Sequence, residues 1–121
     1  ISTGINASRT QEVVKAILNE CKKLSITLVS TDELNKAKEN YIGHLFMGLE
    51  TTNRLAEFYS IGEVTSGKLK SPFDIEKAIR KVTAKEVMAV AKDLFRNDKL
   101  NLAIVGNIPD HKSAKKVLTF K

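Results

Sequence analysis

The residues that could carry chemistry in this chain are few and widely separated. The two histidines, His44 and His111, lie far apart, and neither has a metal-ligating residue at helical spacing. The chain has no His-x-x-Glu-His segment and a single cysteine, Cys21, so it lacks the ligand patterns of a zinc site. No serine, threonine or cysteine has a neighbouring histidine that would activate it as a nucleophile. From the residues alone, we expect no catalytic, cofactor-binding or metal-binding residue in this chain.

The isolated histidine and cysteine are better explained by structure than by chemistry. His44 lies in the middle of a predicted helix, where we expect a surface position. Cys21 shares an apolar helical face with Ile17 and Leu24, which indicates packing. A single cysteine excludes an internal disulfide and favours a reducing compartment, so the cytoplasm is the favoured location. Because the chain starts at Ile1 rather than methionine, we expect it to be a piece of a larger protein whose address signal could lie elsewhere.

The charge balance is basic but dispersed. Twenty Lys and Arg face 14 Asp and Glu, giving a net charge of +6. The cations are scattered among acids along the whole chain, and no aromatic residues alternate with them to stack bases, so we expect no nucleic-acid partner. No run reaches the roughly 18 apolar residues of a membrane span. The alternative that stays open is a stand-alone basic module that binds RNA or an acidic protein partner.

One long segment, residues 30–67, dominates the predicted elements. Ser30 with Glu33 has the capping-box spacing, and Gly67 is a typical helix stop. No proline intervenes, so we predict one continuous helix. Its apolar residues recur at three- and four-residue spacing with a phase shift around residues 51–53. The residues of this stripe are Leu34, Ala37, Tyr41, Leu45, Leu49, Leu55, Phe58 and Tyr59.

Three further helices are predicted. The first covers residues 8–24 and starts with Ser8 and Gln11 as a capping box. The second starts at the Ser-Pro-Phe-Asp segment of residues 71–74 and runs to about Lys81. The third covers residues 83–95, where Thr-Ala-Lys-Glu opens the helix.

Strands are expected near the two ends of the chain. Residues 1–7 suggest the end of a strand, and residues 100–105 (LNLAIV) suggest a buried one. Residues 116–120 could add a third. The expected fold class is therefore α+β: a single domain over residues 1–121, with four helices, including the long central one, packed on a small, mainly antiparallel sheet. Because two strands are marginal alone, we expect missing strand neighbours, and two copies could pair as a homodimer.

The order of these segments resembles zinc peptidases of the insulinase and pitrilysin family, over about residues 4–106. The closest likeness is to the processing-peptidase branch. The resemblance rests on an ordered set: Thr-Asp-Glu-Leu followed by Ala-Lys, then Leu-Glu-Thr-Thr, a glycine after the long helix, Val-Thr-Ala-Lys-Glu-Val, and a closing apolar run that ends in Val-Gly.

The resemblance implies the C-terminal part of such a peptidase. Family members are built from two homologous α+β halves that close around a chamber, with zinc held in the N-terminal half. The implied partners are that catalytic half or a partner subunit, and a peptide substrate in the intact protein. In the region equivalent to the zinc glutamate's helix, this chain has Ala37 and His44 instead of glutamates. The resemblance therefore implies zinc-dependent proteolysis by the whole protein and no catalysis by this part alone.

Overall fold

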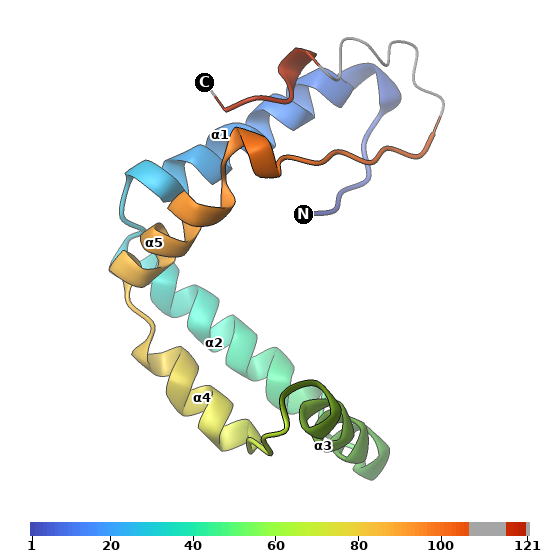
Figure 1. Cartoon of the computed structure of the whole chain (residues 1–121), viewed down its shortest axis with the longest axis vertical. Helices are drawn as coiled ribbons and strands as arrows, with labels where there is room; N and C mark the ends of the chain where they lie inside the picture. The colour runs from blue at the N-terminus through green and yellow to red at the C-terminus, as the bar shows by residue number, and fades with distance from the viewer. Residues whose placement is uncertain (107–115, 121) are drawn as a thin grey trace. The chain divides into compact units, whose positions relative to one another are not determined.

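The structure is a computed structural model that describes residues 1–106 and 116–120 (Figure 1). These residues form five α-helices, and they contain no β-strand. The predicted α+β fold with a small antiparallel sheet is therefore wrong, because the observed fold is helical. The chain divides into two compact units. We call Ile1–Leu28 with Lys85–Lys121 the first unit, and Val29–Ala84 the second unit.

The first unit is built around helix α1, Thr10–Ile26, with most of helix α5, Ala84–Leu94. A 3-10 turn, Ala7–Arg9, precedes α1, and a second one, Asn97–Lys99, follows α5. The buried apolar side chains of the unit come from both helices, and they are Val14, Leu18, Cys21 and Ala91. The first three recur at spacings of four and three residues, so one stripe of α1 faces the core.

The start of α1 differs from the prediction. No side-chain cap is made at Arg9, the residue before the helix. Instead, Asn6 caps the preceding 3-10 turn by accepting a hydrogen bond from the Ser8 backbone N–H at 3.1 Å. The Ser8–Gln11 capping box is therefore wrong. An asparagine two residues upstream offers the same kind of oxygen acceptor, and it holds the chain in the turn that leads into α1.

The predicted strands are also wrong, because none of the three segments is a strand. Residues 1–6 have no regular structure, residues 101–105 are irregular, and residues 116–117 are helical. Among the described residues, no backbone hydrogen bond links residues 101–105 to another segment. A β-rich run becomes a strand only when a neighbouring strand pairs with its N–H and C=O groups, and the part of the chain that the structure describes supplies no such strand.

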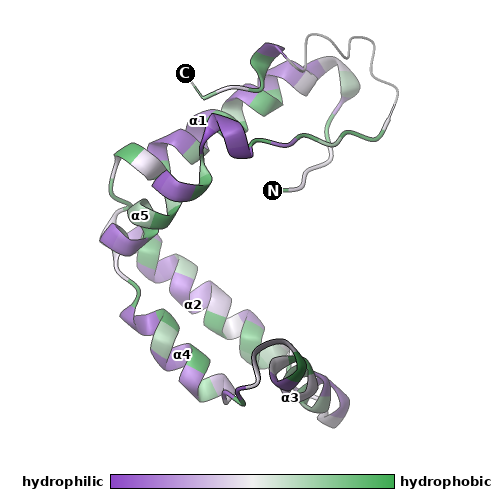
Figure 2. Cartoon of the chain, in the orientation of Figure 1, coloured by the Kyte–Doolittle hydropathy of each residue, from purple (hydrophilic) through white to green (hydrophobic). Residues whose placement is uncertain are grey.

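The second unit contains helices α2, Thr31–Met47, α3, Thr52–Ser66, and α4, Pro72–Lys81. Helices α2 and α4 lie side by side and run in opposite directions (Figure 1). Phe46 near the end of α2 stacks against Phe73 at the start of α4, with ring centroids 5.4 Å apart. At the other end, the Lys38 ammonium donates to the Arg80 carbonyl oxygen at 3.0 Å. Both helices carry hydrophobic and hydrophilic residues along their length (Figure 2).

The predicted long helix is in fact two helices, α2 and α3. The break covers residues 48–51. Thr51 has extended backbone angles, and its hydroxyl accepts the Arg54 N–H at 3.3 Å, which caps a new helix. At Gly48 the chain is so close to itself that an added Cβ would lie 3.1 Å from the His44 carbonyl oxygen. Gly48 therefore ends α2 and Thr51 caps the start of α3, so the chain does not continue as one helix.

The inner face of α2 is also rotated relative to the predicted stripe. Ile42 is the buried residue of this helix, whereas Tyr41 is 53% exposed. Leu34, Leu45 and Phe46 are half-buried, as expected for residues flanking Ile42 on one helical face. The predicted stripe assumes one helix through residues 30–67. It does not match the buried face of α2, because α2 ends at Met47.

Several local signals are confirmed. Ser30 caps α2 by accepting the Glu33 N–H at 3.2 Å. Ser71 and Asp74 form a reciprocal capping box on α4, with Pro72 in the first turn. Gly67 ends α3 in the left-handed conformation, with φ at 60°. These short-range signals decide helix ends independently of tertiary packing.

Two glycine substitutions should change stability in opposite directions. Gly67→Ala is expected to lower the free energy of unfolding by about 1–2 kcal/mol, because a Cβ strains the left-handed conformation. Gly43→Ala should raise it by about 0.5–1 kcal/mol, because Gly43 lies inside α2 and an added Cβ meets no atom within 4 Å. Urea denaturation measures both. Effects of the same sign would contradict the assigned helix end.

Large apolar side chains remain exposed in both units. Among them, Val64 is 87% exposed, Leu69 is 65% exposed and Phe73 is 62% exposed. In the first unit, Leu102 and Val105 are exposed in the unpaired run of residues 101–105. None of the helices in the described part of the chain is long and apolar enough to span a membrane.

We expect the purified chain to self-associate, because exposed apolar side chains favour association. The run of residues 101–105, which has no backbone hydrogen-bond partner among the described residues, favours it too. Light scattering coupled to gel filtration should give a mass above that of the 13.4 kDa monomer, rising with concentration. A monomer at every concentration would contradict this, and would mean that the chain tolerates this surface in water.

Candidate functional site

The predicted surface position of His44 is confirmed. His44 is exposed on α2, where its Nδ1 lies 2.8 Å from the Asn40 carbonyl oxygen. His111 lies outside the described residues. Ala37 is also exposed on α2. Within residues 1–106 and 116–120, no group of three His, Cys, Asp or Glu side chains could hold a metal ion. These residues therefore do not fit the zinc site that the family resemblance implies for the whole protein.

Cys21 is a buried packing residue of α1. The residue is 6% exposed, and burial raises the pKa of its thiol above the ordinary value. A raised pKa keeps sulfur in the protonated form, which is a poor nucleophile and a poor metal ligand. The predicted packing position of Cys21 is confirmed.

An apolar groove of about 360 Å³ lies in the first unit beside Cys21. We call it the apolar groove. Leu18 on α1, Phe95 after α5 and Leu102 in the irregular run are among the residues that line it. Its lining is drawn from four segments that are far apart in sequence. The groove therefore marks where apolar side chains of this unit meet without closing over one another.

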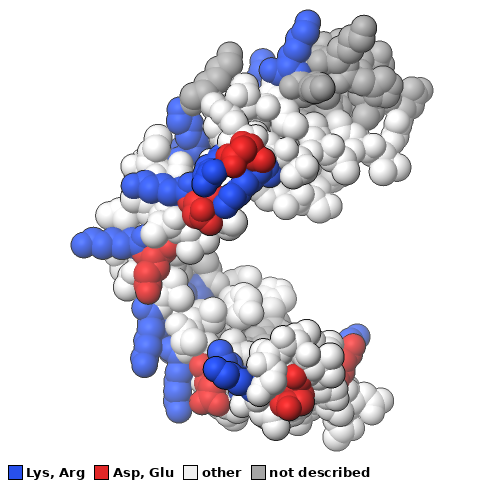
Figure 3. Space-filling model, viewed as in Figure 1, with Lys and Arg blue, Asp and Glu red and all other residues white. Residues whose placement is uncertain are grey.

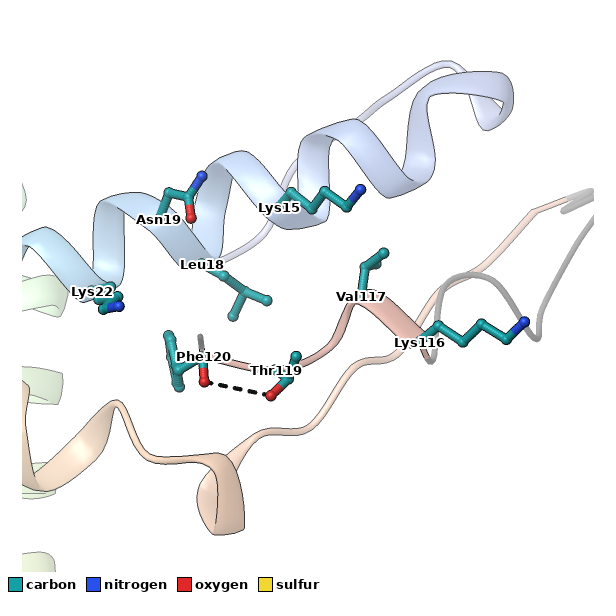
Figure 4. A pocket seen from close by; sticks show the side chains of 8 residues that line it. All are labelled: Lys15, Leu18, Asn19, Lys22, Lys116, Val117, Thr119 and Phe120. Atoms are coloured by element: carbon teal, nitrogen blue, oxygen red, sulfur yellow. Dashed lines mark hydrogen bonds between the residues drawn. The ribbon is translucent and has the colours of Figure 1, made fainter.

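A second cavity, of about 330 Å³, is also lined by Leu18 (Figure 4). We call it the lysine pocket. It lies between α1 and the segment of residues 116–120. Its lining residues combine cationic, apolar and hydrogen-bonding side chains, and they are Lys15, Leu18, Asn19, Lys22, Lys116, Val117, Thr119 and Phe120. The four residues from α1 recur at spacings of three and four, so they share one helical face.

Asn97 holds one wall of the lysine pocket in place. Its Oδ1 accepts the Phe120 N–H at 2.7 Å, and its Nδ2 donates to the Phe120 carbonyl oxygen at 3.3 Å. The same Oδ1 accepts the Thr119 hydroxyl at 3.3 Å. The Phe120 ring lies 6.2 Å from the Phe95 ring between centroids. An asparagine in the turn after α5 thus fixes a segment 23 residues further along the chain.

The net charge of the chain comes from the first unit. This unit has twelve Lys and Arg against six Asp and Glu, whereas the second unit has eight of each. On the face seen in Figure 3, blue and red side chains alternate over the α2–α4 helices. The cations are scattered along the sequence, and the division between the units is not visible there, because the first unit combines both ends of the chain.

Ion pairs join α2 and α4 in the second unit. The Arg80 guanidinium binds Glu39 on α2 and also bonds Glu76 on its own helix, at 2.8 Å. The hydrogen bond from Arg80 lowers the pKa of Glu39 below its ordinary value. All three side chains are partly or largely exposed, so the ion pair contributes only modestly to the free energy of unfolding. Its main effect is to fix the register of the two helices.

This pair should give a pH-dependent contribution to stability. Because the pKa of Glu39 is lowered in the folded state, its ionised form stabilises the fold. This contribution is complete above the ordinary glutamate pKa of about 4.3 and is lost as the pH falls through the lowered pKa. Arg80→Gln should therefore lower the urea midpoint at pH 7 more than at pH 3. A midpoint difference between the two proteins that is larger at pH 3 would contradict the assigned pair.

Comparison with known proteins points to one family. The chain is 27% identical over 107 residues to the mitochondrial-processing peptidase subunit beta of Saccharomyces cerevisiae, covering 88% of this chain and 23% of the relative. It is 31% identical over 100 residues to the same subunit of Neurospora crassa, covering 83% of this chain and 21% of the relative. It is 28% identical over 109 residues to an uncharacterized zinc protease, YmxG, of Bacillus subtilis, covering 88% and 26%.

The chain spans about a quarter of the length of the curated relatives it matches. No family model matches the chain, and no solved structure gives a significant match. The relatives nevertheless agree with one another and cover most of this sequence. Over most of its length, this chain is similar to mitochondrial-processing peptidase beta subunits and to bacterial zinc proteases, which is consistent with a fragment of an insulinase-family zinc peptidase.

Proposed function

We propose that this chain is the non-zinc-binding, C-terminal part of a zinc-dependent endopeptidase. Its role is to help close the substrate chamber and to support peptide binding, without catalysis of its own. The observation that carries the proposal is homology over most of the chain to peptidase subunits and zinc proteases. The 121 residues contain no His-x-x-Glu-His motif, so zinc would be held by another part of the protein.

The surface of the chain supports a role in contact with other parts of a protein. Few of its large apolar residues are fully buried, and the apolar groove is open. Apolar surface of this kind is typical of a segment that packs against a neighbour. The partner in this proposal is the N-terminal catalytic half or a partner subunit, with a peptide substrate held in the assembled protein.

The purified chain tests the proposal directly. After dialysis, plasma mass spectrometry should find much less than one zinc per chain. A quenched fluorescent peptide should not be cleaved above the buffer rate, with or without added zinc. One tightly held zinc per chain, or cleavage that a chelator abolishes, would overturn the proposed non-catalytic role.

A further inference from the structure

We propose that residues 116–120 form a strap that closes the apolar groove of the first unit, and that this strap opens locally while the helices stay folded. Asn97 holds the strap in its closed position. The proposal goes beyond the peptidase role proposed above and does not depend on it. It rests on the side chains that the strap places in the groove, on the hydrogen bonds that hold it, and on the burial of Cys21 in the groove lining.

The strap contributes two large apolar side chains to the apolar groove. Leu118 and Phe120 line it together with side chains of α1 and of residues 94–102. The Phe120 ring packs on Phe95, with ring centroids 6.2 Å apart. In Figure 4, Leu18 points from α1 toward the strap. Both strap residues are half-buried, so movement of the strap would bring apolar surface of the groove into contact with water.

Asn97 binds the strap through its side-chain amide. Its Oδ1 accepts the Phe120 N–H at 2.7 Å and the Thr119 hydroxyl at 3.3 Å, and its Nδ2 donates to the Phe120 carbonyl oxygen at 3.3 Å. The described lining of the groove does not include Asn97 itself. Any effect of Asn97 on access to the groove must therefore pass through the strap.

The strap lies outside the most buried part of the first unit. The buried apolar side chains of this unit belong to α1 and α5, and they are Val14, Leu18, Cys21 and Ala91. Residues 117–120 of the strap are only half-buried, and the Thr119 N–H bonds the Val117 carbonyl oxygen within the strap itself, at 2.9 Å. A segment of this kind opens at a lower free energy than the unit as a whole.

Cys21 provides a probe of the groove. It is the single cysteine of the chain, it is 6% exposed, and it lines the groove together with Phe120. A closed strap should therefore slow the reaction of its thiol with a reagent that must enter the groove. Dithiodipyridine is a suitable reagent because it is uncharged, so attraction to the surplus lysines of this unit does not affect the rate.

The test compares the rate of Cys21 labelling in the unchanged chain and in Asn97→Ala. The variant should react about fivefold to tenfold faster, which is the factor expected when roughly one net hydrogen bond is lost. In both proteins the rate should stay level over the first additions of urea, because local opening exposes little surface. Circular dichroism checks that the variant keeps its helices.

The matched control is Asn101→Ala. Asn101 lies in the groove lining of the same unit, and its Nδ2 donates to the nearby Lys99 carbonyl oxygen at 3.2 Å. Removal of this amide should change the labelling rate by less than about twofold, as for an ordinary surface substitution.

Three results would overturn the proposal. Equal acceleration in Asn97→Ala and Asn101→Ala would mean that any loss near the groove exposes Cys21. An unchanged rate in Asn97→Ala would mean that the strap does not control access. A rate that rises steeply from the first addition of urea would mean that Cys21 reacts only through global unfolding.

Discussion

Replacing Leu18 by alanine is expected to lower the free energy of unfolding by about 2–5 kcal/mol. Leu18 is 8% exposed and lines both the apolar groove and the lysine pocket. Truncation of its side chain would enlarge both cavities and expose apolar side chains from α1 and from residues 118–120. Urea denaturation followed by circular dichroism measures the change.

Ile26→Ala is the control for this prediction. Ile26 is on the same helix but is 64% exposed, and its truncation should cost no more than about 0.5 kcal/mol. Comparable losses for Leu18 and Ile26 would show that α1 presents a different face to the core of the first unit.

Ile42→Ala should have a similarly large effect in the second unit, about 2–5 kcal/mol. Ile42 is 6% exposed and is the buried residue of α2. The adjacent Tyr41 is 53% exposed, so Tyr41→Ala should cost much less, although its side chain is larger. The pair compares neighbouring positions of one helix and tests its rotation.

The same urea melts decide between the structure and the sequence-based stripe. That stripe placed Tyr41 inward and did not include Ile42. A larger loss from Tyr41→Ala than from Ile42→Ala would restore the sequence-based stripe and contradict the observed packing of α2 on α4.

Sequence reasoning succeeded where a feature depends on a few adjacent residues. Ser30 and Ser71 cap helices as predicted, and Gly67 ends one in the left-handed conformation. Each of these outcomes follows from a side-chain acceptor or from a missing Cβ within one turn of the chain. The order of such segments also predicted a resemblance to zinc peptidases of the insulinase and pitrilysin family. The similarity of most of the chain to a processing-peptidase subunit and to a zinc protease agrees with that prediction.

Sequence reasoning failed where a feature depends on competition or on distant partners. The apolar stripe shifts phase around residues 51–53, but with no proline in residues 30–67 this shift did not predict the helix end at Gly48. The β-rich run of residues 100–105 predicted a strand, but pattern alone supplies no neighbour to pair with it. The lysine pocket joins α1 to residues 116–120, and its only signal in the sequence was the seven-residue spacing of Lys15 and Lys22.

The central claim is that this chain serves a zinc peptidase without holding its zinc. The most direct measurement compares the full-length protein with a version that lacks only these 121 residues. Zinc content and cleavage of a fluorescent peptide are measured on both. The account predicts that the shortened protein keeps about one zinc, as expected for a ligand set outside this segment, and loses most of its peptide cleavage. Loss of zinc together with this segment, or cleavage that is unchanged without it, would contradict the account.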